Sequence, residues 1–289
     1  MQAFYLDQGT IMKRFVVFFL FLSFPSYSCL HHQSNHEKWS ISFLGIFEGH
    51  EALTRFALKD TPKPHFFHEN ELIDGVRGSD KADFELSILY GKELPETIFD
   101  IVDSISDWHH HPRLQNLHFL RNKNTLTKKY ESLKETCKET KGLIQKWSDI
   151  AFNLYRVTGG NEDLVHYLLG HILHIIQDSY SSAHTKRNQN NEITDVCHFS
   201  DQTIFDKKGR KICGHQGLQI LDKDRIWKKG ECDYNPFKRS RHCLSPYAEK
   251  AVVATTDYLK VINRVFHFGN NFSKIPLDNF FKKHIDCKI

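Results

Sequence analysis

The feature that most constrains the fold is the segment 168–187, LLGHILHIIQDSYSSAHTKR. Apolar residues recur on nearly every side of a helical projection from residue 164 to residue 176. Asn161 supplies an N-cap, and Glu162 and Asp163 follow it in the first turn. A helix that is apolar all round is predicted to be buried. The chain is therefore expected to be built around one central helix.

Three polar residues interrupt this apolar helix, namely His171, His174 and Asp178. Their spacing places them on one stripe, and His184 follows where the helix can end and turn back. Burying an imidazole or a carboxylate costs several kcal/mol unless the group is hydrogen-bonded, paired or bound to a metal. His171 taken alone is typical of a hydrogen-bonded core histidine. The other three together indicate a metal site, because imidazoles and carboxylates are common zinc ligands.

The pattern His174-x3-Asp178-x5-His184, preceded by Leu-Gly-x3-His, resembles the central motif of the zinc-dependent phospholipase C and S1/P1 nuclease superfamily. The similarity extends upstream over His118-Phe119, residues 130–141 and residues 147–155. It covers about a third of the chain. The resemblance implies an all-α fold, a single-domain multi-helix bundle with a polynuclear zinc site of two or three ions.

The resemblance also places a ligand near the start of the bundle. His50 stands at the head of the helical pattern EGHEALTRFAL and is similar to the first histidine ligand of the family. Family members also bind metal through a terminal amine and a terminal Trp. Trp39 lies ten residues beyond the expected new terminus, so either the chain is processed differently or one of three possible metals is bound without that contact.

A second histidine ligand and an acidic ligand are implied between residues 90 and 120. His118 is similar to the second histidine of the family, and it is preferred to residues 109–111 because adjacent histidines point in different directions. Glu96 fits the position of the acidic ligand. Asp100 and Asp103 are alternatives that no spacing rule excludes.

Beyond the motif the family has a further His-x3-Glu/Asp arrangement, which this chain lacks. The nearest substitute is His215, with either Asp222 or Asp224 as the carboxylate ligand. His198 with Asp201 is the competing pair. The expected metal ligands are therefore His50, Glu96, His118, His174, Asp178, His184, His215 and Asp222.

The resemblance implies a zinc-dependent phosphodiester hydrolase, in which Asp178 bridges two metals and Glu96 also orients or deprotonates the attacking water. The expected function is a phospholipase C that cleaves phosphatidylcholine-like lipids at a membrane surface as a monomer. A nuclease or 3′-nucleotidase of the same superfamily is the first alternative. A non-catalytic, secreted metal-binding protein is the second. The formal charge of +4 is too small to indicate a nucleic-acid binder.

The first 28 residues are typical of a secretory signal peptide. Met12 is the expected start, because a basic pair and a short apolar run, residues 15–24, follow it. Small residues at 26 and 28 suit a signal peptidase, which would leave Cys29 at the mature terminus. The expected location is secreted or periplasmic, with lipidation of Cys29 as an alternative.

The mature domain is expected to span residues 29–289. Six cysteines besides Cys29 allow up to three disulfides after export, and four of them lie between residues 197 and 243. That concentration predicts a Cys-rich loop insertion at about residues 185–245. Further expectations are a connecting loop at 60–82, a long amphipathic helix or helix pair at 125–157, and a final helix that begins at Ser245-Pro246.

Overall fold

The structure is a computed structural model that describes residues 49–62, 66–79, 115–124, 126–159, 163–182, 184–198, 204–205, 211–213, 240–268 and 275–288. These residues belong to one compact unit, Ser34–Ile289. The helices are α3 (Gly49–Asp60), α4 (Glu69–Gly78), α7 (Leu133–Thr158), α8 (Asp163–Asp178), α9 (Pro246–Phe268) and α10 (Asp278–His284), with short 3-10 turns η3 (Gln115–His118) and η6 (Arg241–Cys243). The described part is mostly helical, as the all-α expectation requires.

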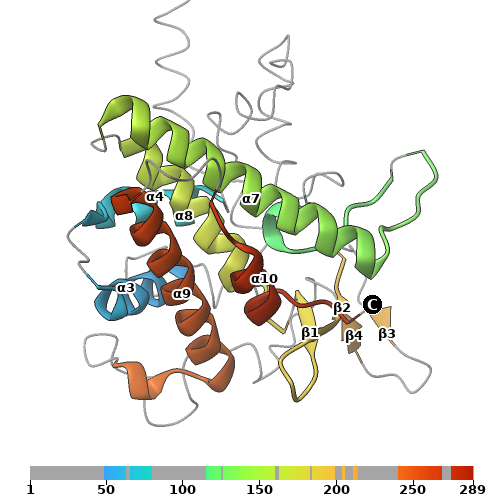
Figure 1. The fold of residues 1–289 in the computed structure, drawn as a ribbon. Helices are drawn as coiled ribbons and strands as arrows, with labels where there is room; N and C mark the ends of the chain where they lie inside the picture. Colours follow the sequence, from blue (N-terminus) through green and yellow to red (C-terminus); the bar gives the residue numbers. More distant parts are fainter. Residues whose placement is uncertain are drawn as a thin grey trace, which may run out of the picture. The chain divides into compact units, whose positions relative to one another are not determined.

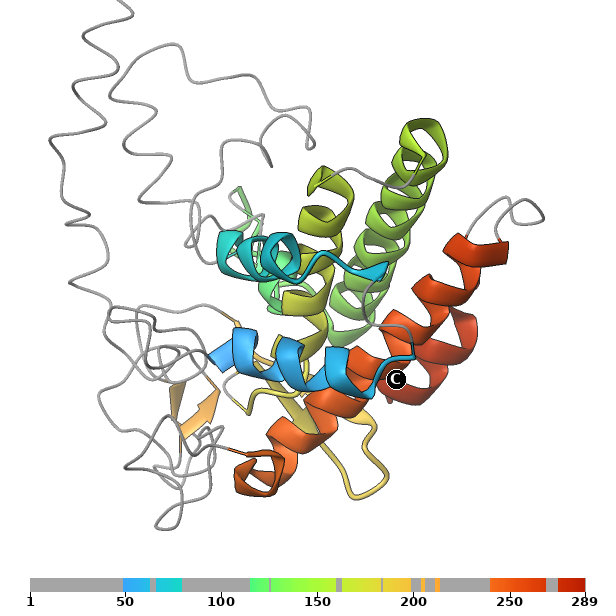
Figure 2. The ribbon, with the colours of Figure 1, turned by 90° about the vertical axis from the view of Figure 1, so that its left-hand side faces the viewer.

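Helix α8 is the central element. It contacts α3, α4, α7 and α9, and Figures 1 and 2 show these helices around it. Its aliphatic residues from Val165 to Ile176 are 0–1% exposed, whereas Leu164 in the first turn is 38% exposed. The prediction of a buried central helix is confirmed, because an all-round apolar helix is stable only when other helices cover each of its sides.

The expected connecting loop at 60–82 is wrong, because α4 (Glu69–Gly78) lies within it and packs along α8. Gly75 in this stretch does not mark a turn; it allows α4 to pack closely against α8. A Cβ atom on Gly75 would lie 2.0 Å from the Tyr167 carbonyl oxygen, and one on Gly170 would lie 2.3 Å from the Leu72 carbonyl oxygen. The two glycines therefore let the two backbones approach each other.

Helix α7 begins later than the expected residue 125. Ser132 is its N-cap, and a capping box with Glu135 fixes the start: Glu135 N–H donates to Ser132 Oγ and Ser132 N–H donates to the Glu135 carboxylate. Its end agrees with the prediction, because Gly159 stops the helix in the left-handed conformation with φ 75°.

Helix α9 begins at Pro246 as predicted, but it is not the final helix, because α10 follows it. Its residues Ala251, Leu259, Ile262 and Phe266 are buried, whereas Tyr247 in the first turn is 37% exposed. None of the helices in the described ranges is both long and apolar enough to cross a membrane.

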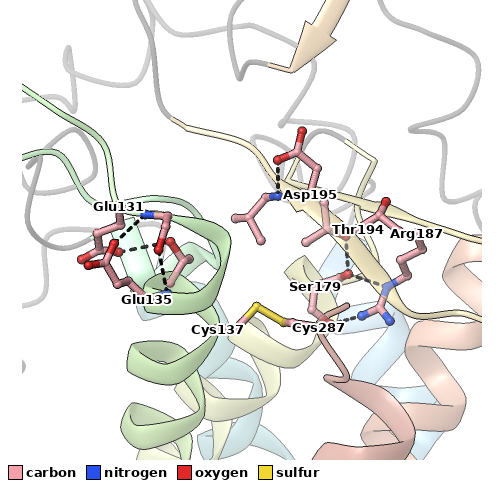
Figure 3. The surroundings of a disulfide bond; sticks show 12 residues. Glu131, Glu135, Cys137, Ser179, Arg187, Thr194, Asp195 and Cys287 are labelled. Atoms are coloured by element: carbon pink, nitrogen blue, oxygen red, sulfur yellow. Dashed lines mark hydrogen bonds between the residues drawn. A yellow bond between two sulfur atoms is a disulfide. The ribbon is translucent and has the colours of Figure 1, made fainter. Parts of the chain in front are cut away.

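Two small antiparallel hairpins lie in the expected Cys-rich insertion: β1 (Thr185–Arg187) with β2 (Ile193–Val196), and β3 (Ile204–Phe205) with β4 (Lys211–Cys213). A disulfide joins Cys137 in α7 to Cys287 near the C-terminus (Figure 3). The C-terminal segment also pairs with β2, since Ile193 N–H donates to Asp286 O (2.7 Å) and Lys288 N–H donates to Ile193 O (2.9 Å). Cys197 and Cys243 each take part in a disulfide as well.

We expect Gly170→Ala to destabilise the protein by about 3 kcal/mol, because the new methyl group meets the backbone of α4. Gly142→Ala is the matched control. A Cβ atom at Gly142 has no neighbour within 4 Å, so this helix-favouring change should stabilise α7 by about 0.5–1 kcal/mol. Urea unfolding measures both. Equal free energies of unfolding for the two variants would contradict the close approach.

We expect Cys137→Ser to lower the free energy of unfolding by about 3–5 kcal/mol, because the disulfide closes a loop with a sequence separation of 150 residues. Cys287→Ser should cost about the same, and the double variant no more than either single variant. Additive costs would show that the two cysteines act independently.

Candidate metal centre

Asp178 is the centre of a buried histidine cluster. It is the last residue of α8, and its side chain is 0% exposed. His174 Nε2 and His118 Nδ1 lie 3.0 and 3.4 Å from its Oδ2 atom. His50 Nε2 lies 3.3 Å from Oδ1, and His184 Nδ1 lies 3.7 Å from Oδ2. The structure therefore brings together five of the eight expected ligands, all at most 2% exposed.

Four separate segments supply these side chains. His50 is in the first turn of α3, and His118 ends η3, where Phe119 turns the chain with φ 50°. His174 is one helical turn before Asp178. After α8 the backbone bends back on itself, with Ser181 N–H donating to Asp178 O and His184 N–H donating to Ser181 O. This turn is the predicted reversal that brings His184 to the carboxylate.

Hydrogen bonds fix the tautomers of two histidines. His174 Nδ1–H donates to the Val76 carbonyl oxygen (3.0 Å), which can only accept. Gln177 donates its amide N–H to Thr54 Oγ1 (2.9 Å), and its Oε1 accepts from His50 Nδ1–H (2.8 Å). In the neutral form both Nε2 atoms then carry lone pairs directed at Asp178. Such contacts to the second ring nitrogen are typical of metal-binding histidines.

A lone pair that faces a carboxylate oxygen at 3.3 Å, as between His50 and Asp178, is repulsive unless a proton or a cation lies between the two atoms. A metal ion removes this repulsion. The ligand atoms of His50, His174 and Asp178 all lie within 4.8 Å of one another. This group could therefore hold a metal ion, and its imidazole and carboxylate donors suit a transition metal.

Protonation states also favour binding of a cation. Burial alone would raise the pKa of Asp178, but positive charge on His184 and His174 lowers this pKa well below its usual range, and a bound cation would lower it in the same way. Burial lowers the pKa of His184. His184 Nδ1, the ring nitrogen 3.7 Å from Asp178 Oδ2, donates to the His118 carbonyl oxygen, so the lone pair of neutral His184 is on Nε2. A carboxylate and neutral imidazoles are the forms that bind metals.

His171 lies outside this cluster, as predicted for a core histidine. Its Nδ1 atom and the Ser79 hydroxyl are hydrogen-bonded at 2.6 Å. Its ring packs edge-on against the rings of Trp147 and Tyr167. Burial, with smaller contributions from His174 and His118, lowers its pKa to about 3.

The remaining expected ligands, Glu96, His215 and Asp222, lie outside the described residues, and so do their alternatives Asp100, Asp103 and Asp224. They stay predictions, as does the competing partner Asp201. His198 is described and stacks on Tyr130 at 4.0 Å between ring centroids. Residues 109–111 and Trp39 are also outside the described ranges.

The sequence analysis did not identify the residues that orient the histidines. Gln177 directly precedes Asp178, so its place in the motif was a usable signal. No sequence signal indicated the Val76 carbonyl, because its contact with His174 depends on how α4 packs against α8. A second group with metal-binding geometry was also not predicted from the sequence, namely His68, Glu71 and Asp163. This group stands at the starts of α4 and α8, where helix dipoles disfavour a cation, and the Asp163 side chain is 78% exposed.

Comparisons with known proteins leave the family open. No family model matches the chain, and neither a curated protein nor a solved structure is significantly similar to it. The proposal for function therefore depends on the motif and on the geometry of the cluster.

We expect the metal-free protein to lose stability on acidification below pH 6.5, partly through His171. Its pKa is lower in the folded state than in the unfolded state, so unfolding takes up a proton between pH 6.5 and about pH 3. His171→Gln should reduce the slope by up to about 1.4 kcal/mol per pH unit. Urea titrations with a chelator measure this slope. A slope that stays the same in His171→Gln would contradict the assignment.

Proposed function

We propose that the chain is a zinc-dependent phosphodiester hydrolase of the phospholipase C type, which cleaves phosphatidylcholine-like lipids to diacylglycerol and a phosphorylated head group. The observation that carries the proposal is the buried carboxylate of Asp178 with four histidines around it. His174, Asp178 and His184 stand in the spacing of the phospholipase C and S1/P1 nuclease motif.

Zinc is the proposed metal because neutral imidazoles and a carboxylate are its usual ligands in hydrolytic sites. His50, His118, His174, Asp178 and His184 would hold it, and Glu96, His215 and Asp222 are proposed to complete a site for two or three ions. When bound, zinc lowers the pKa of a coordinated water to near 7 and neutralises negative charge on a phosphodiester.

The protein's own contribution is orientation and exclusion of water. The Val76 carbonyl and the Gln177 amide hold the rings of His174 and His50 by hydrogen bonds to Nδ1. Burial of Asp178 strengthens its attraction for a cation, because little water competes for it. Glu96 would orient a water molecule at the site or accept a proton from it, and Asp178 would be a ligand of the bound metal.

The lipase is favoured over the nuclease alternative on charge and on sequence. A nuclease needs a basic groove with aromatic side chains on which bases stack. The net charge of +4 is modest, and the segments LGHILH and KETCKETK favour the lipase branch. Secretion or periplasmic export after removal of residues 1–28 is part of the proposal. The Cys137–Cys287 disulfide supports an oxidising compartment.

The direct test is release of phosphocholine from phosphatidylcholine vesicles by the purified protein, with zinc and with a chelator. We expect His174→Ala and Asp178→Asn to lower turnover at least about a hundredfold, because each removes a ligand. The exposed His242→Ala variant should retain activity. A side-by-side assay on single-stranded nucleic acid separates the two enzyme classes: chelator-sensitive nucleotide release would move the protein to the nuclease branch. No zinc-dependent hydrolysis of either substrate would refute the proposal.

A further inference from the structure

A short loop between η3 and α7 presents an apolar side chain to solvent beside several lysines. Leu126 is 87% exposed, and Lys128 and Lys129 are exposed as well. Lys123 and Tyr130 pair across the base of the loop. We refer to Lys123, Leu126, Lys128 and Lys129 as the Leu126 loop, which Figure 1 shows in green, extending away from the start of α7.

The loop is ordered by its own backbone. Asn124 Oδ1 accepts from the N–H groups of Leu126 and Thr127, both at 2.9 Å. Asn124 N–H donates to Lys129 O (2.8 Å), and Lys128 N–H donates to Asn124 O (2.8 Å). These bonds hold Asn124 and residues 126–129 in a turn, so Leu126 is exposed by a defined conformation.

The base of the loop is also held in place. The Tyr130 ring stacks on His198, and Lys123 Nζ lies 5.3 Å from the centre of the Tyr130 ring. Asn122 Nδ2–H donates to the Glu131 carboxylate (3.0 Å). The loop is therefore attached to the hairpin β1–β2 side of the fold and does not depend on a partner for its shape.

Lys128 adopts the left-handed conformation, with φ 58°. Glycine or asparagine would adopt this backbone conformation at a lower energy cost. The lysine therefore places a positive charge at this position although its backbone conformation is unfavourable. The charged residues between positions 122 and 130 are Lys123, Lys128 and Lys129, so the loop carries positive charge. Glu131 and Glu135, which follow it in the chain, accept hydrogen bonds from Asn122 and Ser132.

An exposed leucine among lysines is the combination that binds a bilayer interface: the apolar side chain enters the boundary of the acyl chains, and the lysines attract anionic head groups. The loop also lies between His118, a residue of the candidate metal centre, and the start of α7. Contact of Leu126 with a bilayer would bring the segment that carries His118 to the lipid surface.

We propose that the Leu126 loop is a membrane-docking element that brings the metal centre to a phospholipid surface. The inference rests on the proposed function, because a phospholipid substrate requires approach to a bilayer. It adds which surface of the chain makes that approach and predicts a preference for anionic membranes.

The test is co-flotation of the full-length mature protein with vesicles of phosphatidylcholine alone and of phosphatidylcholine with phosphatidylserine. A chelator is present so that the lipids stay intact. We expect stronger binding to the anionic vesicles, weakened by salt. Leu126→Ser should weaken binding about fivefold or more, and Lys128→Glu/Lys129→Glu should weaken binding to anionic vesicles about tenfold or more.

Matched controls use equally exposed residues elsewhere. Val157, on α7, is 85% exposed, so Val157→Ser removes a similar apolar surface. Lys146→Glu/Lys250→Glu changes the net charge by the same amount at exposed sites on α7 and α9. Both controls should bind vesicles within about twofold of the wild type.

Several results would overturn the inference: no vesicle binding by the wild type, unchanged binding of Leu126→Ser, or an equal loss with Val157→Ser. Binding to single-stranded nucleic acid that depends on Lys128 and Lys129, without binding to vesicles, would also overturn it. The readout does not require hydrolysis. Leu126-dependent binding in a protein that hydrolyses no phospholipid would support the docking surface and refute only the proposed function.

Discussion

The burial of the Asp178 carboxylate is the constraint on which the rest of the structure depends. An isolated charge of this kind is too costly to bury, so the fold must compensate it with opposite charge or with hydrogen-bond donors. Here the surroundings consist of imidazoles from α3, η3, α8 and the turn after α8. Each of these segments is placed by its packing on the central helix or by the turn that follows it. The packing of the helices therefore determines which side chains surround the Asp178 carboxylate.

The close packing of α4 on α8 has a direct consequence for the cluster. Because Gly75 and Gly170 carry no side chains, the two backbones approach closely enough for the Val76 carbonyl to accept from His174 Nδ1–H. The turn after α8 is held in a similar way from the C-terminal side. Arg187 donates to Ser179 O (3.0 Å) and to His284 O (3.0 Å), and the nearby Cys137–Cys287 disulfide anchors that segment to α7 (Figure 3). The C-terminal segment therefore stabilises the turn that brings His184 to the carboxylate.

The sequence predicted what depends on local pattern and missed what depends on distant contacts. Periodicity and capping signals located α8, the end of α7 and the start of α9, and the spacing of His174, Asp178 and His184 located the cluster. Helix α4 was missed because a glycine such as Gly75 usually indicates a loop, and its contact with α8 cannot be predicted from local sequence. The orienting contact of His50 with Gln177 joins residues 127 apart, and no local rule predicts it.

The most direct measurement is anomalous diffraction, at wavelengths on either side of the zinc absorption edge, from crystals of the mature protein grown with zinc. The account predicts a zinc-specific peak between the ring nitrogens of His50 and His174 and the carboxylate of Asp178, and the loss of this peak in Asp178→Asn crystals. Fully loaded crystals that show zinc only at other positions, or none at all, would contradict the central claim that this buried cluster is a metal centre.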